Sequence, residues 1–168
     1  MSTITLTCGG YQKPASIHNR AAQRFGELLG ERVPGLEYKL VGTEGFVNGG
    51  VQFRSVRVAL PPNEMSGYQA DIGAGHSGSL YDESRRKKFL ARADEAVVKQ
   101  LEKAGDWNRY EIRCEGPKVE LTLNGRKTLT FTEDDPTVQP DAGLIALQIH
   151  GNCKAEIAFR KLEITELP

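Results

Sequence analysis

From about residue 42 to the C-terminus, the sequence is a succession of short runs in which polar and apolar residues alternate. Gly, Pro, Asn and Asp separate these runs, and these residues favour turns. Asn124-Gly125 lies between two of the runs and is typical of a two-residue β-hairpin turn. Antiparallel strands at this spacing predict a mostly β chain, built as a sandwich or jelly roll. The predicted strands are 50–59, 67–72, 107–114, 118–124, 126–132, 143–150 and 155–165.

The first 35 residues follow a different pattern. Residues 3–8 predict a strand, and 16–33 predict a helix that ends at Pro34-Gly35. A second strand is expected at 36–42, and strand–helix–strand units normally place their strands as parallel neighbours. The helix carries one apolar stripe, formed by Ile17, Ala21, Phe25 and Leu28. We therefore divide the chain into an N-terminal strand–helix segment, 1–35, and a jelly-roll-like domain, 36–168.

The remaining signals of composition exclude several classes of protein. Lys plus Arg number 22 and Asp plus Glu number 22, so charge gives no reason to expect nucleic acid or an anionic membrane as partner. Neither a spanning helix nor a signal peptide is expected, which leaves the compartment open. The cysteines, Cys8, Cys114 and Cys153, are too far apart to predict a zinc site or a disulfide framework. A second, short helix is predicted at 94–103, capped by Asp94.

Three predicted strands each place a polar pair on one face, because residues i and i+2 of a strand point the same way. The pairs are Gln52 with Arg54, Gln69 with Asp71, and Gln148 with His150. Such a face is either the solvated side of a sheet or a binding cleft. Amides, guanidinium and carboxylate suit a ligand that is rich in hydroxyl groups.

The segment 73–86 is rich in glycine and is predicted to be a loop beside this cleft. It lacks the Gly-Lys-Ser/Thr of a phosphate-binding loop. It contains His76, Tyr81, Asp82 and Glu83, and acids with a nearby histidine are able to ligate a divalent metal. Adjacent acids in a loop are, however, more often simply solvated at the surface.

Six stretches, in this order and spacing, resemble the 3-keto-disaccharide hydrolase domain family. They are NGGVQFRS, NEMSGYQADIG, GSLYDESRR, GDWNRYEIRCEGPKVELTLNGRKTLTFTE, GLIALQIHG and AEIAFRKLEI. The resemblance covers about residues 36–167 and implies a concanavalin-like jelly roll, an antiparallel β-sandwich with a concave surface that faces a sugar. It also implies cleavage of 3-keto glycosides, by hydrolysis or by elimination and hydration, in some members with a divalent metal ion.

The implied chemistry needs a general base that removes the hydrogen on C2 of the keto sugar. His150, Asp71 and Glu83 are the candidates, and the sequence does not rank them. Asp71, His76 and Glu83 are the candidate metal ligands. The side chains expected to hold the sugar are Gln52, Arg54, Gln69, Gln148 and Tyr81.

The front of the chain departs from the family pattern, because the first strands of the jelly roll are lacking. Residues 3–33 instead resemble the N-terminus of periplasmic solute-binding proteins of TRAP-type transporters, so the chain is interpreted as a hybrid. A sandwich without these strands exposes sheet edges. We expect either the stripe of the predicted helix or a second copy of the chain, in a homodimer, to cover them.

Three functions remain open on the sequence alone. The first is an enzyme acting on 3-keto glycosides, and the second is a non-catalytic carbohydrate-binding module that uses the same cleft. The third is a chimeric or truncated domain that folds, as a monomer or dimer, without activity. An enzyme requires a base and a second group that converge on one spot, whereas a module requires only stacking and hydrogen bonds.

Overall fold

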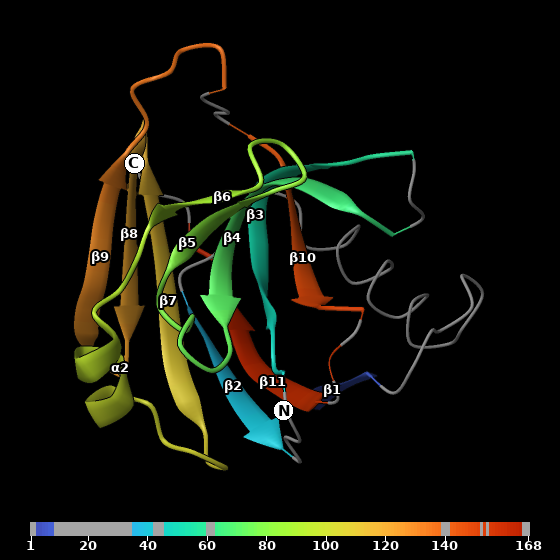
Figure 1. The fold of residues 1–168 in the computed structure, drawn as a ribbon, viewed down its shortest axis with the longest axis vertical. Helices are drawn as coiled ribbons and strands as arrows, with labels where there is room; N and C mark the ends of the chain where they lie inside the picture. The colour runs from blue at the N-terminus through green and yellow to red at the C-terminus, as the bar shows by residue number, and fades with distance from the viewer. Residues whose placement is uncertain are drawn as a thin grey trace.

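The structure, a computed structural model, describes residues 3–8, 35–41, 46–59, 63–138, 142–151, 153 and 155–165. Its strands form two antiparallel sheets that lie face to face (Figure 1). Sheet A has the order β1-β11-β2-β7-β8-β9, and sheet B has the order β10-β3-β4-β5-β6. The strands are β1 (Thr3–Cys8), β2 (Gly35–Val41), β3 (Gly49–Arg57), β4 (Met65–Ile72), β5 (Leu80–Glu83), β6 (Lys88–Ala91), β7 (Asn108–Glu115), β8 (Lys118–Leu123), β9 (Arg126–Thr132), β10 (Leu144–Ile149) and β11 (Ala155–Glu163), and the described helix is α2 (Glu95–Leu101).

Local sequence signals explain the turn between β8 and β9 and the start of the helix. Asn124 and Gly125 have φ angles of 50° and 82°, as a two-residue hairpin turn requires. Asp94 caps α2, because its side chain accepts hydrogen bonds from the backbone N–H groups of Ala96 and Val97, at 2.8 and 3.2 Å. The predicted hairpin and the predicted cap are therefore confirmed.

The core lies between the two sheets and consists of alternate residues of their strands. The rings of Tyr38 and Tyr110 meet edge to face within it, with centroids 5.9 Å apart. Its largest fully buried side chains are Tyr38, Tyr68, Tyr110, Phe159, Leu36, Ile72, Leu80, Leu121, Leu123 and Ile157. The removal of this apolar surface from water is what holds the two layers together.

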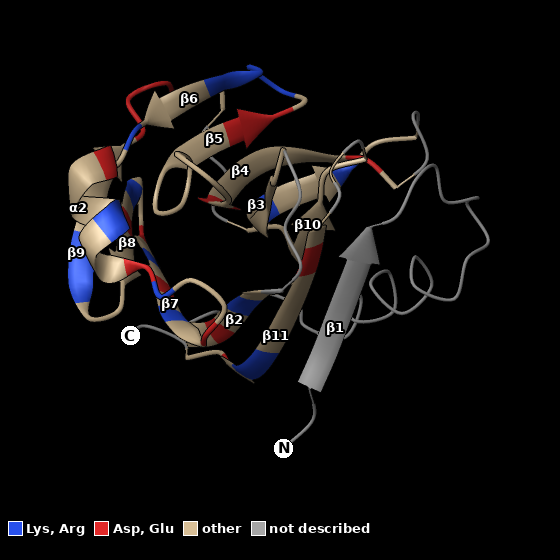
Figure 2. Cartoon of the chain, turned by 60° about the horizontal axis from the view of Figure 1, so that its bottom comes forward, with Lys and Arg blue, Asp and Glu red and all other residues tan. Residues whose placement is uncertain are grey.

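The outer face of sheet A is charged and solvated. Figure 2 shows Lys, Arg, Asp and Glu along β9, β7, β2 and β11. Several of these side chains form ion pairs. The carboxylate of Glu120 lies 2.8 Å from the ammonium group of Lys118, on the same strand, and 2.7 Å from that of Lys127, on the neighbouring strand β9. Ion pairs on an open, solvated sheet face contribute little to stability.

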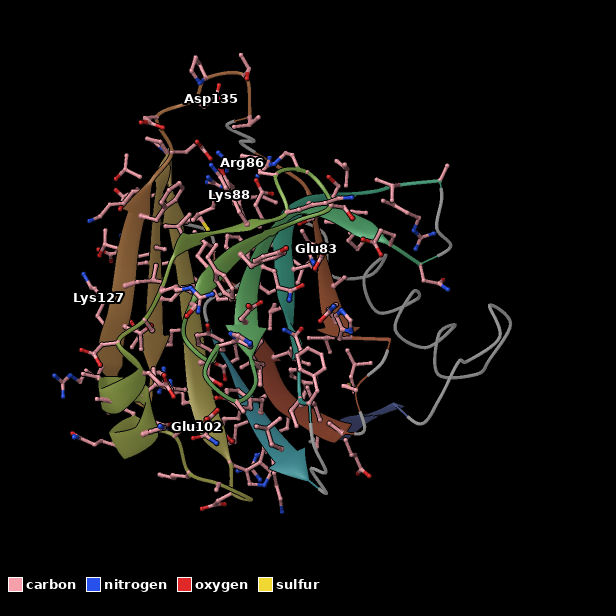
Figure 3. The ribbon with its side chains drawn as sticks, viewed as in Figure 1. Glu83, Arg86, Lys88, Glu102, Lys127 and Asp135 are labelled. Atoms are coloured by element: carbon pink, nitrogen blue, oxygen red, sulfur yellow. The ribbon has the colours of Figure 1, made fainter. Side chains whose placement is uncertain are left out.

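The helix α2 lies at the side of the sandwich where β6 and β9 approach each other (Figure 2). Just after it, Glu102 accepts hydrogen bonds from the hydroxyls of Tyr38 and Ser77, at 2.6 and 2.7 Å (Figure 3). Tyr38 belongs to the core of sheet A, and Ser77 belongs to the turn between β4 and β5. This carboxylate therefore ties both sheets to the end of the helix.

The mostly β jelly-roll fold is as predicted, and two details differ. β5 and β6 lie largely in the segment 73–86 and just beyond it, where we expected a loop, because strands of four residues are too short to show alternation. β1 and β2 are not parallel neighbours, since the C-terminal strand β11 pairs with both and separates them. No helix among the described residues is long and apolar enough to cross a membrane. The predicted helix at 16–33 lies outside the described residues, and the homodimer stays a prediction.

Candidate functional site

The outer face of sheet B, opposite the core, carries most of the residues that the sequence singled out. Cross-strand partners point to the same side of a sheet, so the register defines rows of neighbouring side chains. One row runs across four strands, because Gln52 pairs with Gln69, Gln69 with Tyr81, and Tyr81 with Phe89. The first three members were expected to hold a sugar, and the fold places them side by side.

A second row contains Gln148, Gly50 and Asp71, in that order across β10, β3 and β4. The residue in the middle has no side chain. A Cβ atom at Gly50 would lie 2.6 Å from the carbonyl oxygen of Ala70 and 2.9 Å from Cγ of Gln69. Only glycine fits this position, which leaves Gln148 and Asp71 as the side chains of the row.

Gln52, Gln69 and Asp71 are hydrogen-bonded in series. The amide nitrogen of Gln52 donates to Oε1 of Gln69 at 2.6 Å, and the amide nitrogen of Gln69 donates to Oδ1 of Asp71 at 2.7 Å. The hydroxyl of Ser55 donates to Oε1 of Gln52 at 3.0 Å. The side chains of the two glutamines and of Asp71 are at most 2 % exposed, so the network is shielded from water.

Asp71 has the most perturbed carboxyl group on this face. Burial raises its pKa to about 7, against the pull of the hydrogen bond from Gln69. The negative charge of Glu83 raises the pKa further, and the positive charge of Arg92 lowers it. A carboxylate with a pKa near neutrality is able both to take and to release a proton at physiological pH.

Glu83 and His150 interact with each other on the same side of the sheet. Burial and the charge of Glu64 raise the pKa of Glu83, while a backbone hydrogen bond from Ser84 and the charge of His150 lower it, and the net shift is upward. The imidazole of His150 also meets the ring of Phe46 edge to face, with centroids 5.4 Å apart. The charge of His150 thus acts on Glu83, which is labelled in Figure 3, and the charge of Glu83 in turn acts on Asp71.

An aromatic group continues this face on β5 and β6. The rings of Tyr81 and Phe89 meet edge to face at 5.0 Å, and His76, from the turn after β4, stacks on Phe89 at 5.4 Å. The guanidinium of Arg92 lies 3.7 Å from the centroid of the Phe89 ring. Burial and the nearby carboxylates raise the pKa of Tyr81, so its hydroxyl remains a hydrogen-bond donor.

Arg54 and Gln52 were predicted to share a face of the sheet, and the structure contradicts this prediction. It adopts a φ angle of 46° inside a bulge of β3, where the register shifts between Phe53 and Val56. Its guanidinium donates to the carbonyl oxygen of Gly116, in the turn between β7 and β8, at 2.6 Å. The prediction failed because a bulge breaks the strict alternation on which it depended. Its role in holding a sugar stays a prediction.

The three predicted metal ligands are Asp71, His76 and Glu83. Among the described residues, no group of three or more His, Cys, Asp and Glu side chains lies close enough to hold a metal ion. The carboxyl group of Asp71 is hydrogen-bonded to an amide, and the ring of His76 stacks on Phe89. These side chains as they stand do not fit a metal site, and the divalent ion stays a prediction.

Sequence reasoning missed four residues at this site: Phe46, Ser55, Phe89 and Arg92. Phe89 and Arg92 belong to β6 and the segment after it, where no strand was predicted. Ser55 reaches the network only because of the bulge in β3. Phe46 is half exposed beside His150, and its position next to the Asn48-Gly49-Gly50 motif was the one available signal.

Two buried polar atoms on this face have no hydrogen-bond partner among the described residues. They are Oε1 of Gln148 and Nδ1 of His76. Buried polar atoms are normally satisfied, so each is suited to bind a group that the described residues do not supply. The amide oxygen of Gln148 accepts hydrogen bonds, which suits a hydroxyl.

The two packed antiparallel sheets define a jelly-roll β-sandwich. Solved structures with the same fold include the carbohydrate-binding module CBM66 from Bacillus subtilis, with a TM-score of 0.54 and 14% identity over 79% of this chain and 74% of that chain. Two candidate glycosyl hydrolases from Parabacteroides distasonis are also similar. One has a TM-score of 0.53 and 22% identity over 82% of this chain and 80% of that chain; the other has 0.53 and 18% over 80% and 70%. At these identities the likeness concerns the fold.

The sequence also matches a family model along most of its length. The model of the 3-keto-alpha-glucoside-1,2-lyase-like domain matches residues 33–165, and the chain belongs to this family. No curated protein matches the sequence significantly. The resemblance drawn from the six sequence stretches is thus confirmed at the level of the family.

Proposed function

We propose that the chain cleaves glycosides whose sugar carries a keto group at C3, with Asp71 as general base and His150 as general acid. The observation that carries this proposal is the placement of Asp71, Glu83 and His150 on the outer face of sheet B, where the charge of Glu83 acts on Asp71 and the charge of His150 acts on Glu83. Carbohydrate is the ligand expected for this family and fold.

The reaction is an elimination across C1 and C2 of the oxidised sugar. The keto group at C3 acidifies the hydrogen on C2, and Asp71 takes this hydrogen as a proton. The electron pair left on C2 forms a double bond to C1 as the bond from C1 to the glycosidic oxygen breaks. The departing oxygen takes a proton from His150, and water then adds to the unsaturated keto sugar.

The environments of the two groups support these roles. Burial favours the neutral form of Asp71 and so makes its carboxylate a stronger base than an exposed one. His150 lies near the negative charge of Glu83, and its imidazole is able to donate a proton to the leaving oxygen.

The proposed base and the proposed acid come from strands that are two positions apart in sheet B. Asp71 lies on β4 and His150 follows β10, and β3 lies between these strands. Two strand spacings correspond to about 10 Å. The side chain of Gln69 crosses the space above Gly50. Oε1 of Gln148, which has no hydrogen-bond partner among the described residues, is suited to accept a hydrogen bond from a sugar hydroxyl.

The two roles are separable with two substrates that differ in their leaving group. On a 3-keto disaccharide, both Asp71→Asn and His150→Ala should reduce kcat at least about 100-fold, because each removes a proton-transfer group. On the 4-nitrophenyl 3-keto-glucoside, Asp71→Asn should be equally damaging. His150→Ala should keep most of its activity there, because nitrophenolate leaves without a proton. Release of nitrophenolate and of free sugar are the measurements.

Glu120→Gln, on the outer face of the other sheet, is the control variant and should behave as the wild type. The unoxidised glucoside should not react, since its C2 hydrogen is not acidic. Turnover by Asp71→Asn at the wild-type rate would exclude Asp71 as the base. Activity that is lost in chelator and restored by a divalent ion would show that a metal takes part.

Non-catalytic binding of carbohydrate is the second candidate. The observation in its favour is the aromatic group of Tyr81, Phe89 and His76, which offers ring surface beside a polar sheet face, as sugar-binding sites do. Calorimetric titration with a 3-keto sugar and with its unoxidised form distinguishes the two functions. Equal affinity for both forms, without turnover of either, would favour the binding module.

A further inference from the structure

The outer face of sheet B contains a chain of side-chain hydrogen bonds whose direction is fixed at one end. An ionised carboxylate only accepts hydrogen bonds, so Gln69 must present its amide nitrogen to Asp71. Its oxygen then faces Gln52, which must present its own nitrogen in return. The oxygen of Gln52 is left to accept the hydroxyl of Ser55. The polarity of one carboxylate therefore determines the orientation of two amides.

The backbone is shaped to let these side chains lie along the sheet. Gln69 and Gln52 are direct cross-strand partners, and Gln69 turns toward Asp71 on its own strand. A side chain at Gly50 would fill the space through which Gln69 passes, since its Cβ would lie 2.9 Å from Cγ of Gln69. Glycine at this position is what allows the second amide to reach the carboxylate.

The other end of the series is anchored in the same way. The bulge of β3 brings Ser55 inward until it is fully buried. Its hydroxyl lies 2.5 Å from where a Cβ of Gly67 would be, and is also 3.0 Å from the carbonyl oxygen of Phe53. Two glycines and one bulge thus serve this network.

We propose that Gln52 and Gln69, anchored by Ser55, are positioning residues that hold the carboxyl group of Asp71 in one orientation, and that they do not hold the sugar. The inference rests on the proposed function, in which Asp71 is the base. Both glutamines are at most 1 % exposed, and their oxygen atoms and one N–H of each amide are engaged within the network. Oδ1 of Asp71 is held by Gln69, which leaves Oδ2 to take the proton in the proposed reaction.

The kinetic test uses Gln52→Leu, Gln69→Leu and the double variant, with the 4-nitrophenyl 3-keto-glucoside as substrate. Each single change should lower kcat between about 10- and 100-fold while KM changes less than about twofold. The reason is that a misplaced base slows proton transfer but does not weaken the binding of the sugar. Gln52 acts only through Gln69, so the double variant should be no slower than Gln69→Leu alone. Gln100→Leu, on the exposed face of α2, is the matched control.

A rise in KM with unchanged kcat would overturn the proposal and return the glutamines to the sugar. The proposal would also be overturned if the losses of kcat in the two single variants multiplied in the double variant. Multiplied losses would mean that the two glutamines act independently and not in series.

A second measurement does not depend on turnover. In a ¹⁵N spectrum, the side-chain amide signals of Gln69 and Gln52 should both move in Asp71→Asn, while that of Gln100 should not. Movement of Gln69 alone, or of neither, would overturn the relay even if the leucine variants fail to fold. The proposed function is tested separately from the network. Wild-type turnover by Asp71→Asn would refute the role of Asp71 as the base, while the two amide signals would still report whether the hydrogen-bond network exists.

Discussion

The carboxylate of Glu133, just after β9, is the group whose contribution to stability the structure defines best. It is only 4 % exposed and accepts hydrogen bonds from the hydroxyl of Tyr68 at 2.6 Å and from both terminal nitrogens of Arg86, at 3.0 and 2.6 Å. Arg86, labelled in Figure 3, also bonds to Asp82. Glu133→Gln keeps the shape of the side chain and removes its charge.

Two separate arguments give the same loss in the free energy of unfolding for Glu133→Gln. Burial raises the pKa of Glu133, but the hydrogen bonds from Arg86 and Tyr68 outweigh it and bring the pKa from 4.5 to about 2. This difference corresponds to about 3 kcal/mol of the free energy of unfolding. Breaking a buried ion pair by removing one partner costs about 3–5 kcal/mol, and Asp82 still neutralises Arg86, which favours the lower end.

The sign of the pH dependence follows from the lowered pKa. The stabilisation is complete above about pH 4.5, where Glu133 is ionised in both states, and it is lost as the pH falls through about 2. Urea unfolding of the wild type and of Glu133→Gln at pH 7 should differ by about 3 kcal/mol. At pH 3 the difference should be about half of that.

Glu120→Gln is the control for the role of burial. Hydrogen bonds from Lys118 and Lys127 bring the pKa of Glu120 to about 2 as well, but this carboxylate lies on the open face of sheet A. Solvent screens such pairs, so the change should be much smaller than that of Glu133→Gln. Equal losses for the two variants, or a loss for Glu133→Gln that does not change between pH 7 and pH 3, would refute the reasoning.

Two further changes test how the hairpin and the sheets are held. Asn124→Ala should lower the free energy of unfolding, measured by urea titration, by about 2–3 kcal/mol. It places alanine at a positive φ and removes three side-chain hydrogen bonds, one of them to the carbonyl oxygen of Leu101. Asn124→Gly tolerates the φ angle and should cost less in the same titration. Gly49→Ala should destabilise the protein by about 1–3 kcal/mol, because the new Cβ would lie 2.5 Å from Cδ1 of Ile157 in the facing sheet. At Gly151 a Cβ would meet open space, so Gly151→Ala should leave the melting temperature unchanged. Equal effects at the two glycines would contradict this packing argument.

The outer face of sheet B shows where the alternation of side chains along a strand predicts their positions correctly and where it fails. Gln69 with Asp71 lies on a regular strand, and simple parity placed both residues correctly. Gln52 with Arg54 crosses a bulge, and the same rule placed Arg54 wrongly. Nothing in the local sequence distinguishes the two cases, because a bulge is stabilised by what packs on it. Here Gly143 of the neighbouring segment packs so closely that its Cβ would lie 2.5 Å from the backbone of Arg54.

The roles of the site residues depended still more on the fold. The sequence offered His150, Asp71 and Glu83 as equal candidates for the base, because residue type alone does not reveal burial or neighbouring charge. Only the tertiary structure distinguishes a buried carboxyl with a pKa near 7 from a glutamate that faces a histidine. It likewise shows that two glutamines expected to hold the sugar are hydrogen-bonded in series to Asp71.

By itself, the sequence determined the fold class, the order of most strands and the turn at Asn124-Gly125, because these depend on alternation and turn chemistry within a few residues. It also determined the family, through stretches that recur in order. The tertiary structure decided which strands are neighbours, that β11 separates β1 from β2, and which side chains meet across sheet B. Those outcomes depend on contacts between residues far apart in the chain, and no local pattern specifies them.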